Sequence, residues 1–417
     1  MSPGKSLPIT KRMVWEAYQR VKRNGKAAGV DGQSLEAFAG DLGNNLYRLW
    51  NRLASGSYFP PPVRRVEIPK ASGEGTRPLG IPTVADRIAQ MVVKQVIEPE
   101  WEPFFDQDSY GYRPRKSALE AVARTRERCW KYAWVLDLDI RAFFDSMDHE
   151  LLLRAVHKHT SERWVSRYIE RWLKAPVQLP DGTIEARLAG TPQGGVISPL
   201  LANLYLHYTF DVWMRRNHPS IPFARYADDA VCHCHTQQQA EQLQAALAQR
   251  FADCGLQLHP DKTRVVYCRE SRRRREYPCI QFTFLGYTFR PRMAKSRHGK
   301  VFTGFLPAAS PAALKRMRAQ IRSWKLHRCP TVTLEELSRR HNAVLSGWWQ
   351  YYGRFYPTVL RDRLFRYFDE RLGAWLRNKH KPLRRHRGRS LQVLDQIARQ
   401  RPHLFVHWQH LGHATVG

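Results

Sequence analysis

The residue pair with the clearest potential for chemistry is Asp228-Asp229, within Tyr226-Ala227-Asp228-Asp229 near the middle of the 417-residue chain. Strand-like apolar runs lie on both sides of it, with Phe223 before the pair and Val231 after it. Two adjacent acids between such runs are expected at the tip of a β-hairpin, where they face solvent or a metal ion. A plain Asp-Asp turn is the alternative, because Asp is common in turns for local hydrogen-bonding reasons.

A second acidic segment runs from Ala133 to Ile140 (AWVLDLDI) and is expected to be a buried strand. Side chains alternate along a strand, so Asp137 and Asp139 share one face while the apolar residues share the other. Burial of a charged carboxylate among apolar residues costs free energy unless a cation compensates the charge. That cation is either a metal ion or one of the many arginines.

Carboxylates on rigid, separate elements suit a two-metal phosphoryl-transfer site, in which two divalent ions lie roughly 3.5–4 Å apart. One ion activates a 3′-hydroxyl and the other stabilises the leaving pyrophosphate. Magnesium prefers hard oxygen ligands and keeps positions for substrate phosphates. If the two segments meet in the fold, Asp139, Asp228 and Asp229 are candidates for such a site.

The charge of the chain points to a polyanionic partner. It contains 68 Lys and Arg against 37 Asp and Glu, a net charge of +31, and nucleic acid is the first candidate. Residues 311–417, after an expected linker at 308–311, hold 22 Lys and Arg against 6 Asp and Glu and read as a separate basic helical module. Its aromatic residues are either hydrophobic core or base-stacking platforms. They include Trp348, Trp349, Tyr351, Tyr352 and Trp375.

Several elements are expected to position these residues. Residues 1 to about 60 look helical, and Val63 to Ile68 alternates loosely like a strand. Thr83-x-x-Asp86 resembles a capping box at the start of the next helix. The Gly-rich turn Pro192-Gln193-Gly194-Gly195 precedes a helix with Ser198 as its N-cap, and a backbone loop there suits a phosphate or a base.

The seven cysteines argue against a secreted disulfide framework, because their number is odd and no Cys-x-x-Cys pair occurs. Cys232-His233-Cys234-His235 looks like a metal cluster, but alternate strand residues point to opposite faces, so we interpret it as ordinary strand. No segment approaches ~18 consecutive apolar residues, and no signal peptide precedes Met1. A cytoplasmic protein is therefore expected.

Together these motifs resemble the reverse-transcriptase family, most closely the bacterial group II intron-encoded reverse transcriptase/maturases. The resemblance spans nearly the whole chain. The matching stretches are GKAAGVDG (25–32), VEIPK with TRPLGIPTVADRIAQ (66–90), SYGYRPRKSALEA (109–121), LDLDIRAFFDSMDH (136–149), GTPQGGVISPLLANLYL (190–206), RYADDAV (225–231), LHPDKT (258–263), FLGYTF (284–289), SGWWQYYGRF (346–355) and RLGAWLRNKHK (371–381).

The resemblance implies an α+β right-hand polymerase. Residues 1–125 would form an N-terminal extension and fingers, and 126–305 a palm with an antiparallel sheet, of which about 150–205 contributes partly to the fingers. Residues 306–417 would form the helical thumb/maturase module. Group II proteins often end in a DNA-binding segment and a His-Asn-His-type endonuclease with paired cysteines. No such pairs occur here, so we expect no endonuclease domain.

The resemblance also assigns the metal ligands. It selects Asp139 over Asp137, because Asp139 is the acid of the Asp-Ile-x-x-Phe-Phe pattern. Asp228 and Asp229 are the other two catalytic acids, and the Ile140 carbonyl is a further ligand. The implied cofactor is a pair of Mg²⁺ ions, for which Mn²⁺ can substitute.

Five more residues match nucleotide-binding positions of the family. Lys70 and Arg77 match the fingers residues that grip the incoming triphosphate, as charge-assisted donors do. Phe144 matches the aromatic gate that would clash with a ribose 2′-hydroxyl, and Gln193 the glutamine that contacts the nucleotide. Lys262 sits where the family places a lysine near the pyrophosphate. The sequence alone leaves an alternative for two of these residues. Phe144 could equally be a residue of the hydrophobic core, and Lys262 could be an ordinary solvated lysine.

The implied function is RNA-directed DNA polymerisation: a DNA primer or target is extended on an RNA template with deoxynucleoside triphosphates. The basic module would also bind group II intron RNA and assist splicing. The implied location is the bacterial cytoplasm, in association with the nucleoid or a ribonucleoprotein and with no membrane partner. The alternatives are a splicing-only RNA-binding maturase, a host-adopted reverse transcriptase in defence, spacer acquisition or repair, and RNA-templated RNA synthesis.

Overall fold

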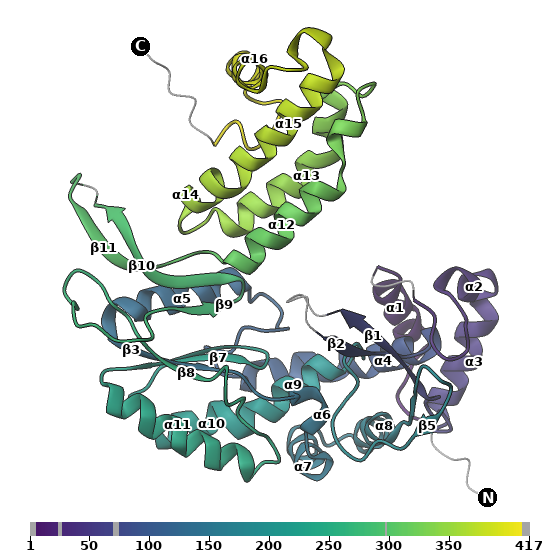
Figure 1. Ribbon diagram of the computed structural model, residues 1–417. Helices are drawn as coiled ribbons and strands as arrows, with labels where there is room; N and C mark the ends of the chain where they lie inside the picture. The colour runs from purple at the N-terminus through teal and green to yellow at the C-terminus, as the bar shows by residue number, and fades with distance from the viewer. Residues whose placement is uncertain (1–5, 24–26, 70–74, 297, 411–417) are drawn as a thin grey trace, which may run out of the picture. The chain divides into compact units, whose positions relative to one another are not determined.

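Residues 6–23, 27–69, 75–296 and 298–410 are described by the structure, which is a computed structural model. Contacts divide the chain into two units, one of residues 1–121 and 136–265 and one of residues 122–135 and 266–417. The chain crosses from one unit to the other three times. These crossings fall within α5 (Ala118–Lys131), β3 (Trp134–Leu138) and β8 (Arg264–Tyr267) (Figure 1).

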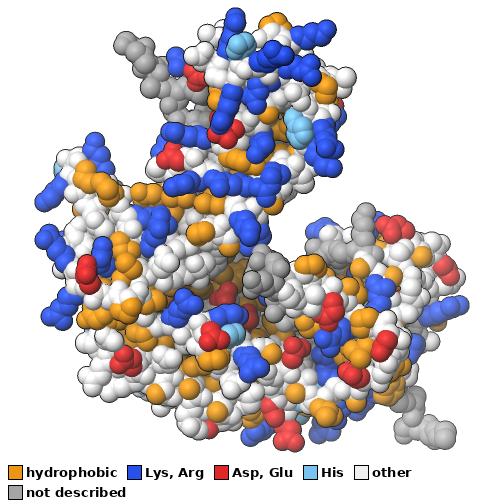
Figure 2. Space-filling model, viewed as in Figure 1, with side chains coloured by type: hydrophobic (Ala, Val, Ile, Leu, Met, Phe, Trp, Pro, Cys, Tyr) orange, Lys and Arg blue, Asp and Glu red, His pale blue; other side chains and the backbone are white. Residues whose placement is uncertain are grey.

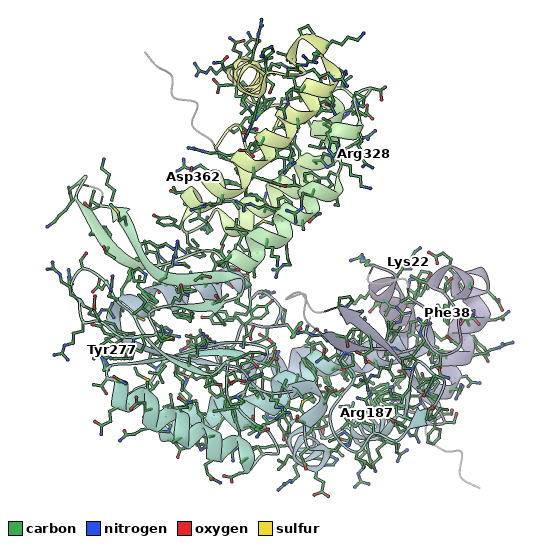
Figure 3. The ribbon with its side chains drawn as sticks, in the orientation of Figure 1. Lys22, Phe38, Arg187, Tyr277, Arg328 and Asp362 are labelled. Atoms are coloured by element: carbon green, nitrogen blue, oxygen red, sulfur yellow. The ribbon has the colours of Figure 1, made fainter. Side chains whose placement is uncertain are left out.

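The first unit begins with helices, as predicted for residues 1 to about 60. They are α1 (Lys11–Lys22), α2 (Leu35–Gly40) and α3 (Leu42–Ala54). Helix α1 buries Val14, Tyr18 and Val21 at helical spacing. Phe38 of α2, labelled in Figure 3, stacks on Tyr18 with 6.3 Å between ring centroids. These helices are therefore joined by a shared apolar core.

A four-stranded sheet of order β2-β1-β4-β5 lies in the first unit, and its two short strands are β4 (Val177–Gln178) and β5 (Ile184–Glu185). Strands β1 (Val63–Pro69) and β2 (Thr76–Ile81) pair antiparallel, which confirms the predicted strand over 63–68. The chain then enters α4 (Val84–Trp101), with Thr83 as N-cap. Only half of the predicted capping box forms: the Thr83 hydroxyl accepts the Asp86 N–H, while the Asp86 carboxylate bonds elsewhere.

A second four-stranded sheet has the order β6-β7-β3-β8 and holds the acidic segments. Strands β6 (Phe223–Tyr226) and β7 (Asp229–Cys234) form an antiparallel hairpin. Helix α11 (Gln237–Ala252) packs on β7 and buries Leu243, Leu247 and Phe251. The Cys-His stretch lies in and after β7 with Cys232 and Cys234 buried, so its interpretation as strand is confirmed. The segment α9 (Ser198–Leu206), π-helical η2 (His207–Asp211) and α10 (Val212–Asn217) is continuous.

The remaining elements of the first unit are helices and two short strands. Ser198 is the first residue of α9, so the predicted N-cap is off by one position: Ile197 precedes the helix. The other elements are η1 (Glu102–Phe104), α6 (Phe143–Ser146), α7 (His149–His159), α8 (Arg163–Lys174), β4 (Val177–Gln178) and β5 (Ile184–Glu185).

The second unit contains a three-stranded sheet of order β11-β10-β9. Its strands are β9 (Phe282–Phe284), β10 (Tyr287–Lys295) and β11 (Val301–Ala309). The linker predicted at 308–311 is wrong. Ala308 and Ala309 are buried and pair with β10, and Ser310 caps the next helix directly. Small residues before a Ser-Pro pair resemble a linker. Their pairing with β10 depends on residues about 20 positions earlier and cannot be recognised from the local sequence.

The second unit is mainly helical from residue 311 to residue 400, as predicted for the basic module. Its elements are α12 (Pro311–Ser323), η3 (Leu326–Arg328), α13 (Leu334–Tyr352), α14 (Pro357–Leu360), η4 (Arg361–Phe365), α15 (Arg366–Lys379), η5 (Lys381–Leu383) and α16 (Arg387–Gln400). Trp375 is buried in their core, and Trp348, Trp349 and Tyr352 pack against it, which favours the core interpretation of these aromatics. Figure 2 shows Lys and Arg side chains over the viewed surface of these helices.

None of the helices in the described ranges is long and apolar enough to cross a membrane.

Candidate active site

The Asp228-Asp229 pair lies at the tip of the β6–β7 hairpin, as predicted. Tyr226 pairs with Asp229 across the hairpin, which leaves Ala227 and Asp228 as the two residues of the turn. Ala227 has a positive φ of 56°, a conformation uncommon for a residue with a side chain. The surrounding structure must hold it there, and two sets of contacts do so.

A buried ion pair supports the turn from inside the unit. The Arg225 guanidinium donates to both carboxylate oxygens of Asp211, with Nε 2.7 Å from Oδ1, and its Nη1 donates to the Ala227 carbonyl at 3.0 Å. Arg225 is 1% exposed and Asp211 is fully buried. Sequence reasoning missed this pair. The sequence did contain a sign of it. Arg225 lies two positions after the inward-facing Phe223 and so shares its face of the strand, and an arginine that faces inward requires a carboxylate.

The second support is the segment before α5. Tyr110 N–H donates to the Arg225 carbonyl at 2.8 Å. Gly111 then lies so close to the turn that a Cβ built on it would be 2.9 Å from the Tyr226 carbonyl carbon and closer still to the Ala227 nitrogen. The Asn203 side chain donates to the Gly111 carbonyl at 2.7 Å. A glycine is therefore required at 111 by close approach.

The third acid, Asp139, follows the end of β3 in the same unit. Its carbonyl accepts the His259 N–H at 2.8 Å, which ties it to the loop that carries Lys262. The Lys262 ammonium lies 3.2 Å from Asp139 Oδ2 and 3.4 Å from Oδ1. The structure thus brings together two residues to which the family resemblance gives different roles, Asp139 as a metal ligand and Lys262 as a residue near the pyrophosphate.

The pKa values show that the three acids share one electrostatic environment. Desolvation by the surrounding protein, then the charges of Asp228 and Asp139, raise the pKa of Asp229 to about 7. Desolvation and the charge of Asp139 also raise the pKa of Asp228. Asp229 still reaches solvent. Repulsion between like charges at an accessible position is what a bound cation relieves.

Asp137 behaves differently from Asp139. Desolvation, followed by the charges of Asp229 and Asp139, raises the pKa of Asp137 to about 8, so this half-buried acid is protonated at neutral pH. A neutral carboxyl is a poor magnesium ligand. The choice of Asp139 over Asp137 as a metal ligand stays a prediction, because the pKa of the other candidate ligand Asp229 is raised as well.

The residues at this site suit a divalent cation in kind. Carboxylate oxygens are the hard ligands that magnesium prefers, and a backbone carbonyl such as that of Ile140 is an oxygen ligand of the same kind. The Lys262 ammonium already places a positive charge at Asp139. Over the described part of the chain, however, no three His, Cys, Asp or Glu side chains are gathered in metal-binding geometry. The acids therefore adjoin one another without converging on one point.

The four predicted nucleotide-binding residues other than Lys262 fall into three groups. Arg77 is exposed on β2. Its positive charge acts to lower the pKa values of Asp228 and Asp229 and so partly opposes the rise caused by desolvation and by the neighbouring acids. Arg77 therefore lies close enough to interact electrostatically with both acids. Phe144 and Gln193 lie on segments that are hydrogen-bonded to each other. Lys70 lies outside the described residues.

The Gly-rich turn joins Phe144, Gln193 and β2. Thr191 N–H donates to the Phe144 carbonyl at 2.7 Å, and Gly80 N–H of β2 donates to the Gln193 carbonyl at 2.7 Å. Gly194 has φ of 112°, and a Cβ built on it would lie 2.5 Å from the Gly80 carbonyl oxygen. The gate residue, the glutamine and the fingers strand are thus fixed through one piece of backbone.

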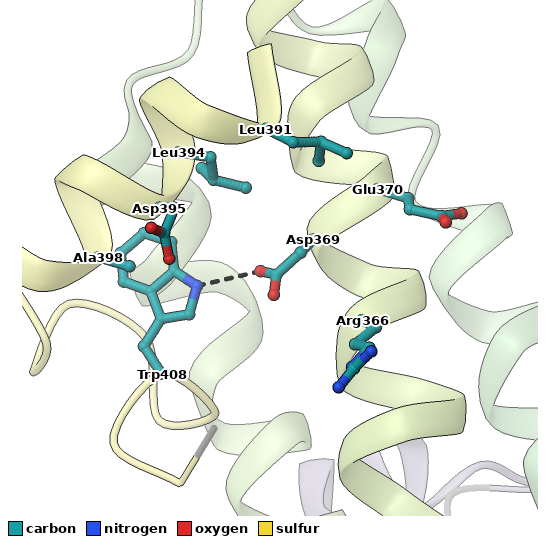
Figure 4. Close-up of a pocket in the computed structure, with 8 residues that line it drawn as sticks. All are labelled: Arg366, Asp369, Glu370, Leu391, Leu394, Asp395, Ala398 and Trp408. Carbon is teal, nitrogen blue, oxygen red and sulfur yellow. Dashed lines mark hydrogen bonds between the residues drawn. The ribbon is translucent and has the colours of Figure 1, made fainter. Parts of the chain in front are cut away.

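Cavities are also found in both units, and none of the three acids lines the two described next. In the first unit, a cavity of about 250 Å³ is lined by Arg65, Asp145, Arg187 and Gln193 among others. In the second unit, a cavity of about 290 Å³ is bounded by α15, α16 and Trp408 (Figure 4). There the Trp408 indole donates to Asp369 at 3.0 Å, a structural bond in the helical core.

Comparison with known proteins gives two family matches. A family described as "Reverse transcriptase (RNA-dependent DNA polymerase)" matches residues 68–289, which include the whole β6-β7-β3-β8 sheet and all the candidate acids. A second family, "Group II intron, maturase-specific domain", matches residues 314–392 of the second unit.

Individual relatives agree with these matches. Protein YkfC of Escherichia coli (strain K12) is 32% identical over 310 residues, which is 66% of this chain and 78% of YkfC. The group II intron-encoded protein LtrA of Lactococcus lactis subsp. cremoris is 35% identical over 191 residues, 46% of this chain and 32% of LtrA. An uncharacterized 91 kDa protein in the cob intron of Schizosaccharomyces pombe is 31% identical over 208 residues, 49% of this chain and 25% of that protein.

Proposed function

The chain belongs to the reverse transcriptase family of RNA-dependent DNA polymerases, and on that premise we propose how its own residues carry out the reaction. It joins a reverse transcriptase region to a group II intron maturase-specific domain, so it is an RNA-directed DNA polymerase with a maturase module. The proposed substrates are deoxynucleoside triphosphates, a DNA primer or target and an RNA template.

The observation that carries the proposal is the shared electrostatic environment of Asp139, Asp228 and Asp229. These acids and the Ile140 carbonyl are the groups that would hold two magnesium ions. When bound, such ions activate the primer 3′-hydroxyl and stabilise the leaving pyrophosphate. Arg77 binds the triphosphate by charge, as does Lys70 in the proposal, and Gln193 and Phe144 contact the incoming nucleotide.

Lys262 has a proposed role beside the pyrophosphate. Its ammonium is bound to Asp139 at 3.2 Å, and its side chain is 58% exposed, so it is free to turn toward a substrate phosphate. A lysine is a mobile point charge with rotatable donors and suits such a task.

We propose that the chain is organised as fingers, palm and thumb. Residues 1–125 form the N-terminal extension and fingers, residues 126–305 the palm, and residues 306–417 the thumb/maturase module. The pairing of β4 with β1 supports a contribution of residues 150–205 to the fingers, because β1 lies in the fingers segment. The thumb/maturase module would bind group II intron RNA through its excess of Lys and Arg.

Primer extension tests the polymerase proposal. With an RNA template, a DNA primer, deoxynucleotides and Mg²⁺, wild-type protein should extend the primer. Asp228→Asn should abolish extension while template–primer binding persists. The exposed Asp253 at the C-terminal end of α11 provides the matched control: Asp253→Asn should extend normally. Extension that survives Asp228→Asn would remove the metal assignment, and a preference for ribonucleotides would overturn the DNA product.

The intron role has a separate test. A search of the flanking DNA for group II intron RNA structure distinguishes an intron protein from a host-adopted enzyme, which would lack it. If such an RNA is found, its self-splicing at low Mg²⁺ should be accelerated by the wild-type protein and equally by Asp228→Asn, because splicing assistance requires RNA binding and not polymerisation.

A further inference from the structure

Gln90 lies beneath the Gly-rich turn and is bonded to it. This residue of α4 is 2% exposed. Its Oε1 accepts the Val196 N–H at 2.8 Å and the Ile197 N–H at 3.3 Å, and its Nε2 donates to Asp86 Oδ2 at 2.9 Å. Gln90 therefore bridges the backbone just after Gly195 and a carboxylate one helical turn earlier in α4.

Asp86 fixes the direction of this bridge. It is 1% exposed, and its Oδ1 accepts the Tyr58 hydroxyl at 2.9 Å and the Trp172 indole N–H at 2.7 Å. Every partner of the carboxylate is a donor. Because an ionised carboxylate only accepts, Gln90 must turn its amide NH₂ toward Asp86 and its oxygen toward the turn.

The backbone of the turn is tightly packed at Gly195. A Cβ built on Gly195 would lie 3.4 Å from Gln90 Oε1 and in hard contact with the Ser198 hydroxyl. On its other side the turn is hydrogen-bonded to Gly80 and Phe144. The Gln193–Ile197 backbone is therefore set from outside by the predicted nucleotide-binding elements and from inside by Gln90.

We propose that Asp86 and Gln90 are positioning residues for the incoming nucleotide: the carboxylate orients the glutamine, and the glutamine holds the turn that presents Gln193. The inference rests on the proposed polymerase function. Loss of the support should weaken nucleotide binding more than the chemical step, because neither residue touches the reacting atoms.

An exchange of the two polar groups provides the test. In Asp86→Asn, the new NH₂ faces the NH₂ of Gln90. In Gln90→Glu, a second carboxylate faces Asp86. In the double variant Asp86→Asn/Gln90→Glu, the amide oxygen introduced at position 86 still accepts from Tyr58 and Trp172, and the amide NH₂ donates to the carboxylate introduced at position 90. That carboxylate accepts both N–H groups of the turn. The total charge and the number of hydrogen bonds are preserved.

Single-nucleotide incorporation is measured for each variant, with KM for the deoxynucleotide separated from kcat and from template–primer affinity. Gln90→Leu and both single exchanges should raise this KM by at least about tenfold, because each variant loses or weakens one or more of the three hydrogen bonds that Gln90 makes. The double exchange should bring it back to within about twofold of wild type. Template–primer affinity should stay unchanged throughout.

Tyr58→Phe is the matched control for packing. It removes a donor to Asp86 but leaves both Gln90 bonds to the turn, so it should lower the melting temperature without raising KM. The inference is overturned if Gln90→Leu leaves KM unchanged, if the double exchange does not restore it, or if Tyr58→Phe raises it equally. A wild-type protein that extends no primer would instead remove the polymerase function on which the inference rests.

Discussion

The Lys262 ammonium lies 3.2 Å from the Asp139 carboxylate, although 123 positions separate the two residues in the chain. Asp139 directly follows β3, and Lys262 belongs to the loop before β8, so the contact exists only because both segments join one sheet region. The pair is open to water, with 31% of the Asp139 side chain and 58% of the Lys262 side chain exposed. A metal ion can therefore displace the ammonium.

Lys262→Met should strengthen Mg²⁺ binding in the absence of substrate, because it removes the cation that competes for Asp139. Exposed ion pairs contribute up to ~1 kcal/mol, so the Mg²⁺ midpoint for thermal stabilisation should fall about two- to fivefold. Differential scanning fluorimetry across a Mg²⁺ titration measures this, with Lys22→Met of α1 as an exposed-lysine control. Equal midpoints for wild type and Lys262→Met would contradict competition at Asp139.

Gly111→Ala should abolish primer extension, because the added methyl group would enter the backbone of the catalytic turn at Tyr226-Ala227. Template–primer binding, measured by fluorescence anisotropy, should persist. Gly43 of α3 has open space at its Cβ position, and Gly43→Ala should be neutral or stabilise by up to ~1 kcal/mol. Normal extension by Gly111→Ala would mean that the turn tolerates displacement.

Arg225→Met should destabilise the protein by about 3–5 kcal/mol, because it leaves the fully buried Asp211 without its cation. Burial already raises the pKa of Asp211, and Arg225 opposes that rise. Urea unfolding measures the loss, and the exposed Arg216→Met of α10 should change stability by less than ~0.5 kcal/mol. A similar small effect in both variants would refute the stabilising role of the pair.

Asp86 should make stability depend on pH in mildly acidic solution. Burial raises the pKa of Asp86 to about 6, opposed by its bonds to Trp172, Tyr58 and Gln90. A raised carboxyl pKa means that the folded state holds its proton longer than the unfolded state. The contribution of Asp86 is therefore largest at low pH and is lost as the pH rises from the ordinary Asp value toward the raised one.

The measurement is the free energy of unfolding of wild type minus that of Asp86→Asn, which cancels the other titrating groups. Between pH 5 and pH 7 this difference should fall by about 1 kcal/mol. The ionisable groups facing Asp86 are few: the Tyr58 hydroxyl bonds to it, and Arg52 lies near Tyr58. A difference that is flat with pH would show that the Asp86 carboxyl does not titrate in this range.

The sequence contains enough to predict the elements that carry the acids. Alternation predicted a strand over 133–140, of which β3 covers residues 134–138, so Asp139 directly follows the strand. Two apolar runs predicted the hairpin tip at Asp228, and both rules depend only on neighbours in the chain. The same local reasoning paired Asp86 with Thr83 in a capping box. It failed there because the carboxylate has stronger partners in Tyr58 and Trp172, distant in sequence.

The contacts that hold the site could not be predicted for the same reason. Arg225 with Asp211, and Gln90 with Val196, join elements whose proximity is a product of the whole fold. A pattern was present in α4, where Asp86 and Gln90 occupy the buried stripe that continues through Val93 and Ile97. Polar residues on a core-facing stripe indicate a buried network, but they do not identify its partners.

The three crossings of the chain between its units limit how this protein could be recombined or divided. Residues 122–135 belong with residues 266–417: the Cys268 N–H bonds to the Ala133 carbonyl, and Arg273 bonds to the carbonyls of Cys129 and Tyr132. A single cut at the start of the maturase-specific match would leave this part of the second unit with the polymerase. Division of the chain into its two units therefore requires cuts at all three crossings.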